Sequence, residues 1–221
     1  MPAQSATGSQ IMRSAFALAA VVAIVGLVGG TWWMTRPGAG GDDPFAACRA
    51  TSIGTGVASI GGPLSLVDET GAAVTEAEVI AKPTLIYFGY TYCPDICPTD
   101  NARNAEAIDL LAAQGHDVEM ALITVDPERD DPERLTDYTD YLHPEAKGYT
   151  GSLEQIQAAA KTYKAYFRKE DNPDPEFYLV DHSTFTYLML PGTGFAEFFK
   201  REVSPAEMAE RVGCFLEATA P

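Results

Sequence analysis

The sequence predicts an α/β domain with a central mixed sheet flanked by helices, preceded by one N-terminal transmembrane helix. Two observations carry this prediction: a long uncharged apolar segment near the N-terminus, and short apolar runs that alternate with segments of helical spacing. The chain has 221 residues, 46% hydrophobic and 21% charged, which suits one globular domain with additional sequence. The formal net charge of -16 argues against binding to nucleic-acid phosphates, so no nucleic-acid partner is expected.

Residues 14–35 form the apolar segment near the N-terminus. They contain no charged side chain, they are numerous enough to cross a bilayer as a helix, and they end in bulky residues suited to a membrane interface, Trp32, Trp33 and Met34. A cleaved secretory signal is the alternative, but such signals have a shorter apolar core and end in small residues. We therefore expect an uncleaved transmembrane anchor, with residues 1–13 as a cytoplasmic flank.

The charges on either side of this segment predict its orientation. The N-terminal flank carries Arg13 and no acidic residue, whereas the acidic bulk of the chain follows Arg36. The flank also lacks the several arginines of a mitochondrial presequence. We expect a single-pass protein of a bacterial inner membrane with its globular domain in the periplasm.

Residues 36–47 are predicted to be a linker, because they contain the Gly-, Pro- and Asp-rich sequence PGAGGDDP. The globular domain is expected over residues 48–221. Its first element is a hairpin at 63–75, where apolar and polar residues alternate around a turn.

The next three segments predict a strand, a helix and a second strand. Residues 84–90 (TLIYFGY) and 118–125 (VEMALITV) are apolar runs typical of buried strands, and residues 101–114 between them have helical spacing. Strands joined through a helix in this way are parallel.

The remaining segments complete the alternation of helices and strands. The predicted helices are 132–142, 152–166 and 205–218, and the predicted strands are 177–180, 185–190 and 195–199. A central sheet flanked by helices, with an antiparallel pair late in the chain, is typical of a thioredoxin-like domain.

Cys93 and Cys97 lie between the first buried strand and its helix, in the sequence Cys-Pro-Asp-Ile-Cys-Pro. A thiol at the start of a helix is favoured as the thiolate by the helix dipole and by free backbone N–H groups. Cysteines at positions i and i+4 fall on one face of the first turn, so both sulfurs can point at a single metal ion. An inert disulfide or a buried pair of thiols is the alternative interpretation.

His182 is the candidate third ligand. It closes the predicted strand 177–180, at an edge where loops of such folds gather functional groups, whereas His116 and His143 lie in other loops and are expected on the surface. Two thiolates and one imidazole fit Cu(I), while zinc usually takes a fourth ligand. Asp181 either hydrogen-bonds the imidazole or serves as a turn residue.

Four motifs resemble those of the Sco/SenC family of copper-binding proteins, in the same order and spacing over about residues 50–218. They are 88–98 (FGYTYCPDICP), 126–132 (DPERDDP), 148–151 (GYTG) and 178–183 (YLVDHS). The resemblance implies a thioredoxin-like fold with an N-terminal membrane helix, and a copper site of Cys93, Cys97 and His182. One departure is Asp131, where the family often has threonine.

The resemblance also implies a function. Family members are metallochaperones that deliver copper, as Cu(I) or Cu(II), to the dinuclear copper centre of cytochrome c oxidase subunit II, or assist its assembly. Some act instead as thiol-disulfide reductants or redox sensors, and action of that kind on the same target's cysteines is the alternative function. The residues themselves argue against a dedicated thiol-disulfide oxidoreductase, which uses two intervening residues where this chain has three. A copper chaperone without catalytic residues is the expectation.

Cys48 and Cys214 are the two remaining cysteines. One precedes the domain and the other lies in its last predicted helix. An oxidising compartment and an even cysteine count predict a disulfide between them, with two separate buried thiols as the alternative.

Overall fold

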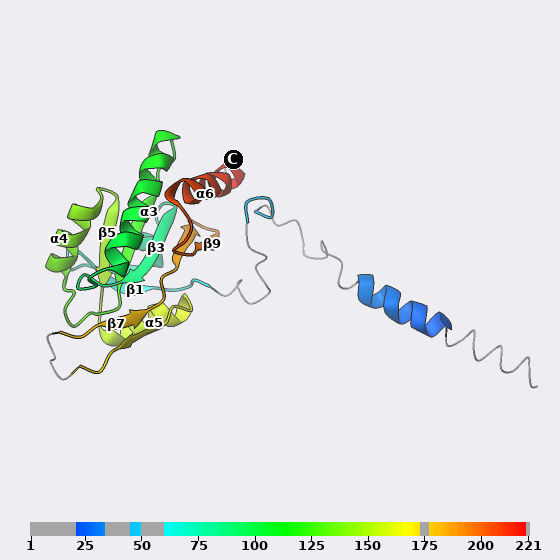
Figure 1. The fold of residues 1–221 in the computed structure, drawn as a ribbon, viewed down its shortest axis with the longest axis horizontal. Helices are drawn as coiled ribbons and strands as arrows, with labels where there is room; N and C mark the ends of the chain where they lie inside the picture. Colours follow the sequence, from blue (N-terminus) through cyan, green and yellow to red (C-terminus); the bar gives the residue numbers. More distant parts are fainter. Residues whose placement is uncertain (1–20, 34–44, 50–59, 173–176, 220–221) are drawn as a thin grey trace, which may run out of the picture. The chain divides into compact units, whose positions relative to one another are not determined.

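The computed structural model describes residues 21–33, 45–49, 60–172 and 177–219 (Figure 1). The chain divides into two compact units, Met1–Ala46 and Ala47–Pro221. Residues 21–33 are helical, which covers the middle of the predicted anchor; its two ends, the flank 1–13 and most of the linker lie outside the described residues. Within the described ranges, no helix combines the length and the apolar character needed to cross a bilayer.

The second unit is built on one seven-stranded mixed sheet with strand order β2-β1-β5-β4-β3-β8-β9. The strands are β1 Ser65–Asp68, β2 Ala73–Thr75, β3 Thr84–Gly89, β4 Glu119–Thr124, β5 Ala146–Thr150, β8 Thr186–Leu190 and β9 Gly194–Phe199. Strands β3, β4 and β5 are parallel to one another, and the other pairings are antiparallel. This is the predicted α/β thioredoxin-like fold with a mixed central sheet.

Five helices belong to this unit, counted over its described residues. They are α2 Glu76–Val79, α3 Ile96–Ala113, α4 Pro132–Leu142, α5 Leu153–Thr162 and α6 Pro205–Thr219. Helices α3 and α6 pack side by side (Figure 1). Local sequence explains two helix starts: the Asp131 side chain accepts the N–H of Arg134 at 2.8 Å, and Ser152 and Gln155 form a capping box. Asp131, the departure from the family pattern, is therefore an N-cap.

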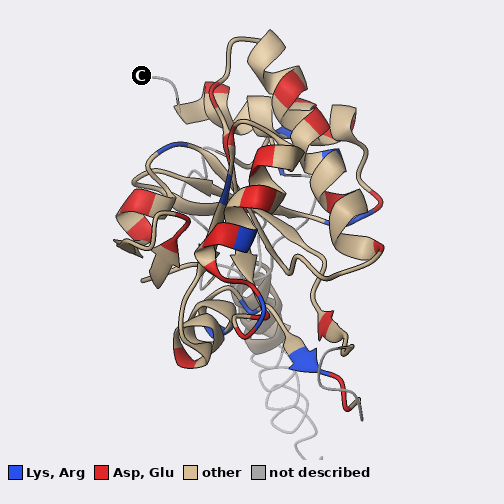
Figure 2. Ribbon diagram, turned by 90° about the vertical axis from the view of Figure 1, so that its left-hand side faces the viewer, with Lys and Arg blue, Asp and Glu red and all other residues tan. Residues whose placement is uncertain are grey.

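The central strands form the core that fixes the rest of the domain. Every residue of β3 and β4 is buried. The pairing of Thr84 with Glu119 through to Gly89 with Thr124 confirms the predicted parallel register. Acidic residues are spread over several helices and loops around this core (Figure 2). This distribution is typical of a solvated surface.

Several predicted boundaries were wrong. Helix α3 begins at Ile96 rather than at residue 101, because a proline is tolerated in a first turn whose N–H groups have no helical acceptors, and Pro98 lies there. Helix α5 ends at Thr162 rather than at residue 166, since Lys164 takes the left-handed conformation (φ 55°) that commonly ends a helix. Strand β5 and helix α2 were not predicted.

The strand predicted at 177–180 lies instead at Val180–His182, which is β7. Phe177 and Leu179 are exposed, so their apolar character does not mark a buried strand. Strand β7 pairs antiparallel with β6, Phe167–Lys169, in a separate two-stranded sheet whose register sets Phe167 opposite His182. This short sheet carries His182 towards the end of β3.

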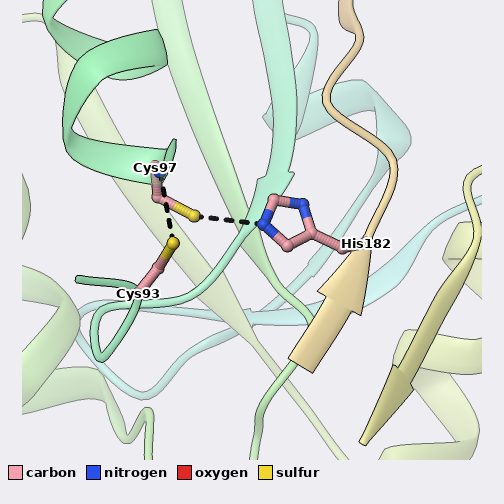
Figure 3. Close-up of side chains that lie close together, drawn as sticks. All are labelled: Cys93, Cys97 and His182. Atoms are coloured by element: carbon pink, nitrogen blue, oxygen red, sulfur yellow. Dashed lines mark hydrogen bonds between the residues drawn. The ribbon is translucent and has the colours of Figure 1, made fainter. Parts of the chain in front are cut away.

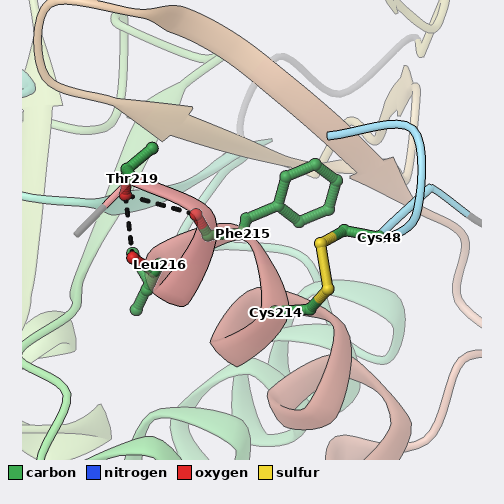
Figure 4. The surroundings of a disulfide bond; sticks show 5 residues. All are labelled: Cys48, Cys214, Phe215, Leu216 and Thr219. Atoms are coloured by element: carbon green, nitrogen blue, oxygen red, sulfur yellow. Dashed lines mark hydrogen bonds between the residues drawn. A yellow bond between two sulfur atoms is a disulfide. The ribbon is translucent and has the colours of Figure 1, made fainter. Parts of the chain in front are cut away.

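The disulfide between Cys48 and Cys214 is present, as predicted (Figure 4). It joins the first residues of the second unit to α6 across 166 positions of sequence. Cys48 is buried, so the bond lies against the domain.

Candidate metal centre

Cys93 and Cys97 occupy the connection between β3 and α3. Because β3 is fully buried and Cys97 lies in the first turn of α3, the two ends of this connection are fixed by the core. The backbone N–H of Cys97 donates to Sγ of Cys93 at 3.3 Å, which folds the loop so that both sulfurs face the same point. Both cysteines are free thiols and both are buried.

His182, the last residue of β7, meets this pair from the opposite side (Figure 3). Its Nε2 lies 3.3 Å from Sγ of Cys97, and its ring packs edge-on against Tyr87 and Tyr90 with centroids 5.9 and 5.8 Å apart. The three candidate ligand atoms all lie within 4.8 Å of one another. The structure thus brings together the three residues that the sequence singled out.

The tautomer of His182 is set by its other ring nitrogen. Nδ1 lies 2.9 Å from the backbone carbonyl oxygen of Ser183, which can only accept a hydrogen bond. Nδ1 therefore carries the proton, and the lone pair of Nε2 faces Cys97. Asp181 does not orient the imidazole, because its carboxylate pairs with Arg168 at 3.3 Å.

The two thiols hold one negative charge between them. Donation by the Cys97 thiol lowers the pKa of Cys93 far below its ordinary value. The same hydrogen bond, together with burial, raises the pKa of Cys97. Without a metal ion, Cys93 is therefore the thiolate and Cys97 keeps the shared proton. A bound cation would replace that proton.

The loop before Cys93 is held by a buried carboxylate. Asp130 accepts hydrogen bonds from the Thr91 backbone N–H at 3.0 Å, from the Thr91 hydroxyl at 2.6 Å and from the Thr124 hydroxyl at 2.6 Å. Burial raises the pKa of Asp130. Asp130 belongs to the motif DPERDDP, but the sequence alone did not indicate its role in holding this loop.

A second cluster holds the His182 hairpin against the β4–α4 loop. The Tyr178 hydroxyl donates to Asp126 at 2.6 Å, and the Arg129 guanidinium lies 3.6 Å above the Tyr178 ring. The Val180 N–H donates to the Tyr90 hydroxyl at 3.2 Å, which ties β7 to the cysteine loop. The DPERDDP motif thus positions both halves of the site.

Gly89 leaves room for the Cys97 sulfur. A Cβ at this position would lie 2.7 Å from Cε1 of Tyr87, closer than real Cβ contacts allow, and 3.0 Å from Sγ of Cys97, which is a tight contact. Tyr87 is fully buried. Only glycine fits here without displacing a candidate ligand.

The centre opens onto a cavity of about 370 Å³. Its lining includes Cys93, His182, Tyr90, Ile96 and Leu179, with three carboxylates at Asp95, Glu170 and Asp181. Cys97 is not part of the lining. An incoming ion or partner therefore reaches Cys93 and His182 first.

Comparison with known proteins relates these features to a family. Residues 54–217 match the family described as SCO1/SenC. Protein SenC of Rhodobacter capsulatus is 52% identical over 202 residues, which cover 91% of this chain and 89% of that protein. The Schizosaccharomyces pombe protein sco1 is 40% identical over 159 residues, covering 71% of this chain and 60% of that protein.

Two solved structures are similar in fold as well as in sequence. Arabidopsis thaliana ScoI with copper bound is 39% identical, with a TM-score of 0.68 over 72% of this chain and 99% of that one. Yeast Sco1 with copper bound is 34% identical, with a TM-score of 0.69 over 74% of this chain and 91% of that one. With its family match over most of its length, the chain belongs to the SCO1/SenC family.

Proposed function

We propose that this protein is a copper metallochaperone that holds its ion through Cys93, Cys97 and His182. The observation that carries the proposal is the convergence of two sulfurs and one imidazole nitrogen within 4.8 Å, from two separate parts of the fold. Soft, low-coordinate ligand sets of this kind suit Cu(I). The copper-bound state of the Arabidopsis and yeast relatives supports the same choice.

The chain's own residues account for loading. The Cys93 thiolate and the Nε2 lone pair of His182 border the cavity and take the ion first, and Cys97 then gives up its proton and completes the set. Cu(I) held by these three residues would still be able to accept a further ligand, and the cavity lined by Cys93 and His182 would give that ligand access. A receiving protein can offer its own thiolate or imidazole there and take the ion over.

We propose that the receiver is cytochrome c oxidase subunit II, or another copper or thiol protein, and that delivery assists assembly of its dinuclear copper centre. This step rests on membership of the family. We also propose the organisation into a flank 1–13, an anchor 14–35, a linker 36–47 and a copper-binding domain 48–221. The domain is then held on the periplasmic face of a bacterial inner membrane.

A thiol-disulfide reductant acting on the same target is the second candidate. One observation favours it: Cys93 is a thiolate at a cavity mouth, and Cys97 lies directly behind it to resolve a mixed disulfide. This mechanism has no use for His182 as a ligand.

The test is copper stoichiometry on the full-length protein purified in detergent. After reduction under anaerobic conditions, it is expected to take up one equivalent of Cu(I). After oxidation of Cys93 and Cys97 to a disulfide it is expected to bind negligible Cu(I), because both thiolate ligands are consumed. Equal binding in the two states would overturn the proposal.

A further inference from the structure

A buried carboxylate lies directly behind the metal centre. Asp100 follows Cys97 by three positions on α3, so both side chains emerge from the same face of the helix. Asp100 is 2% exposed, and its Oδ2 accepts the Tyr87 hydroxyl at 2.9 Å. The Tyr87 ring in turn packs edge-on against His182. One side chain therefore separates this carboxylate from the candidate ligands.

The other carboxylate oxygen of Asp100, Oδ1, is paired with a cationic side chain. Arg201 donates from Nε to Oδ1 of Asp100 at 3.2 Å, and its side chain is 38% exposed. Arg103 donates its hydrogen bonds to Lys200, Asn104 and Thr186, but this buried guanidinium also interacts electrostatically with Asp100 and, like Arg201, offsets part of its charge. Water screens Arg201 more than Asp100. The metal centre therefore feels part of the Asp100 charge.

The energy of interaction between Asp100 and a bound ion depends on the charge of that ion. A carboxylate attracts a divalent ion twice as strongly as a monovalent ion at the same position. We propose that Asp100 acts through Tyr87 and through its charge to raise the preference of the centre for divalent over monovalent copper, and that Arg201 limits this effect. The inference rests on the proposed copper function and adds to it a control over oxidation state.

The test compares the affinities of reduced full-length protein for Cu(I) and for Cd(II). Cd(II) is the divalent probe because it binds thiolates without oxidising them. The variants are Asp100→Asn, which keeps an oxygen acceptor for Tyr87, and Arg201→Gln. Glu197→Gln is the matched control, since Glu197 is a fully buried carboxylate on strand β9 that pairs with Arg211 at 2.9 Å.

Asp100→Asn is expected to weaken Cd(II) more than Cu(I), lowering the ratio of the two association constants roughly tenfold. Arg201→Gln should move the ratio in the opposite direction. Glu197→Gln should lower thermal stability and leave the ratio unchanged. Loosening of the site alone would weaken both ions equally in either variant, so the opposite signs separate a charge effect from a structural one.

An unchanged ratio in Arg201→Gln, or a shift of the same sign in both variants, would overturn the inference. If Asp100→Asn does not fold, the ratio of the Cd(II) and Cu(I) association constants of Arg201→Gln is sufficient to test the inference, because Arg201 is partly exposed. Failure of the unaltered protein to bind Cu(I) would instead overturn the proposed function, so the two failures are distinguishable.

Discussion

Sγ of Cys97 lies 3.3 Å from Nε2 of His182, although 85 positions of sequence separate the two residues. The contact joins the first turn of α3 to the end of β7, and each partner is held independently. Cys97 is fixed by the core behind β3, whereas His182 is fixed by the Ser183 carbonyl and two tyrosine rings. A site held from both sides needs little rearrangement when an ion enters, which favours affinity.

Gly89→Ala is expected to weaken Cu(I) binding, because the new Cβ would push against Sγ of Cys97 and the ring of Tyr87. Overpacking of this kind also costs about 1 to 3 kcal/mol of folding stability. Competition titration with a Cu(I) chelator and urea unfolding measure the two effects. Gly213→Ala is the control, because its nearest neighbour would lie 3.5 Å away and it belongs to a helix. Copper affinity equal in both variants would show that Gly89 has no special role.

Alkylation of Cys93 by iodoacetamide should remain nearly constant as the pH falls from about 8 to about 6, because its pKa is depressed. An ordinary thiol would slow by roughly 80-fold over the same range. Cys97→Ala removes the donating thiol, so the alkylation rate of this variant should fall with pH. Mass spectrometry of the labelled peptides follows the reaction, and a rate that falls steeply in the unaltered protein would contradict the assignment.

The two thiols affect stability with opposite signs. The depressed pKa of Cys93 contributes stability that is full above the unfolded value, about 8.5, and declines as the pH falls towards the folded value. The raised pKa of Cys97 contributes stability below about 8.5 that is lost as the pH rises above it. In the unaltered protein, the Cys93 thiolate should make the free energy of unfolding rise as the pH increases towards about 8.5. Urea unfolding of Cys93→Ala over the same pH values should show no such rise.

The double variant Cys48→Ser, Cys214→Ser should unfold more readily, by roughly 5 kcal/mol in the chain-entropy model, because the bond closes a loop of most of the domain. Copper stoichiometry should stay at one, since neither residue belongs to the site. Urea unfolding of oxidised and variant protein measures the difference. Indistinguishable midpoints would show that the bond adds no stability.

The sequence predicted those parts of the fold and site that leave a local pattern. The strands β3 and β4 are mostly apolar and fully buried. The cysteine loop and His182 lie at strand ends, so the topology of the sheet predicted that they would lie close together. Strand β5, by contrast, contains Lys147 and Gly148 and has no apolar period. It forms because β1 and β4 flank it, a tertiary effect invisible in a single segment.

The hydrogen bonds that hold the loops of the site were also hard to predict, because they too depend on tertiary structure. The hydrogen bonds from Thr91 to Asp130 and from Tyr178 to Asp126 join residues 39 and 52 positions apart. No local periodicity marks such pairs, because each depends on where two loops finish in space. Sequence motifs indicated that these residues matter, and the structure supplies their partners.

The anchor prediction concerns the intact cell. If residues 14–35 form an uncleaved anchor, the mature protein should fractionate with membranes, keep Met1 or Pro2 at its N-terminus, and be digested by protease added from the periplasmic side. N-terminal sequencing of the membrane fraction is the measurement. A soluble form that begins after Trp33 would instead indicate a cleaved signal.

The copper affinity of His182→Ala tests the central claim most directly, because His182 is the residue on which the chaperone and the thiol reductant disagree. The three-ligand account predicts that this variant loses most of its Cu(I) affinity and lowers cytochrome c oxidase assembly in the cell, while its thiols still reduce a disulfide. His143→Ala is the matched control, since that imidazole lies elsewhere, beside Asp109. Full Cu(I) affinity and normal oxidase activity in His182→Ala would contradict the account.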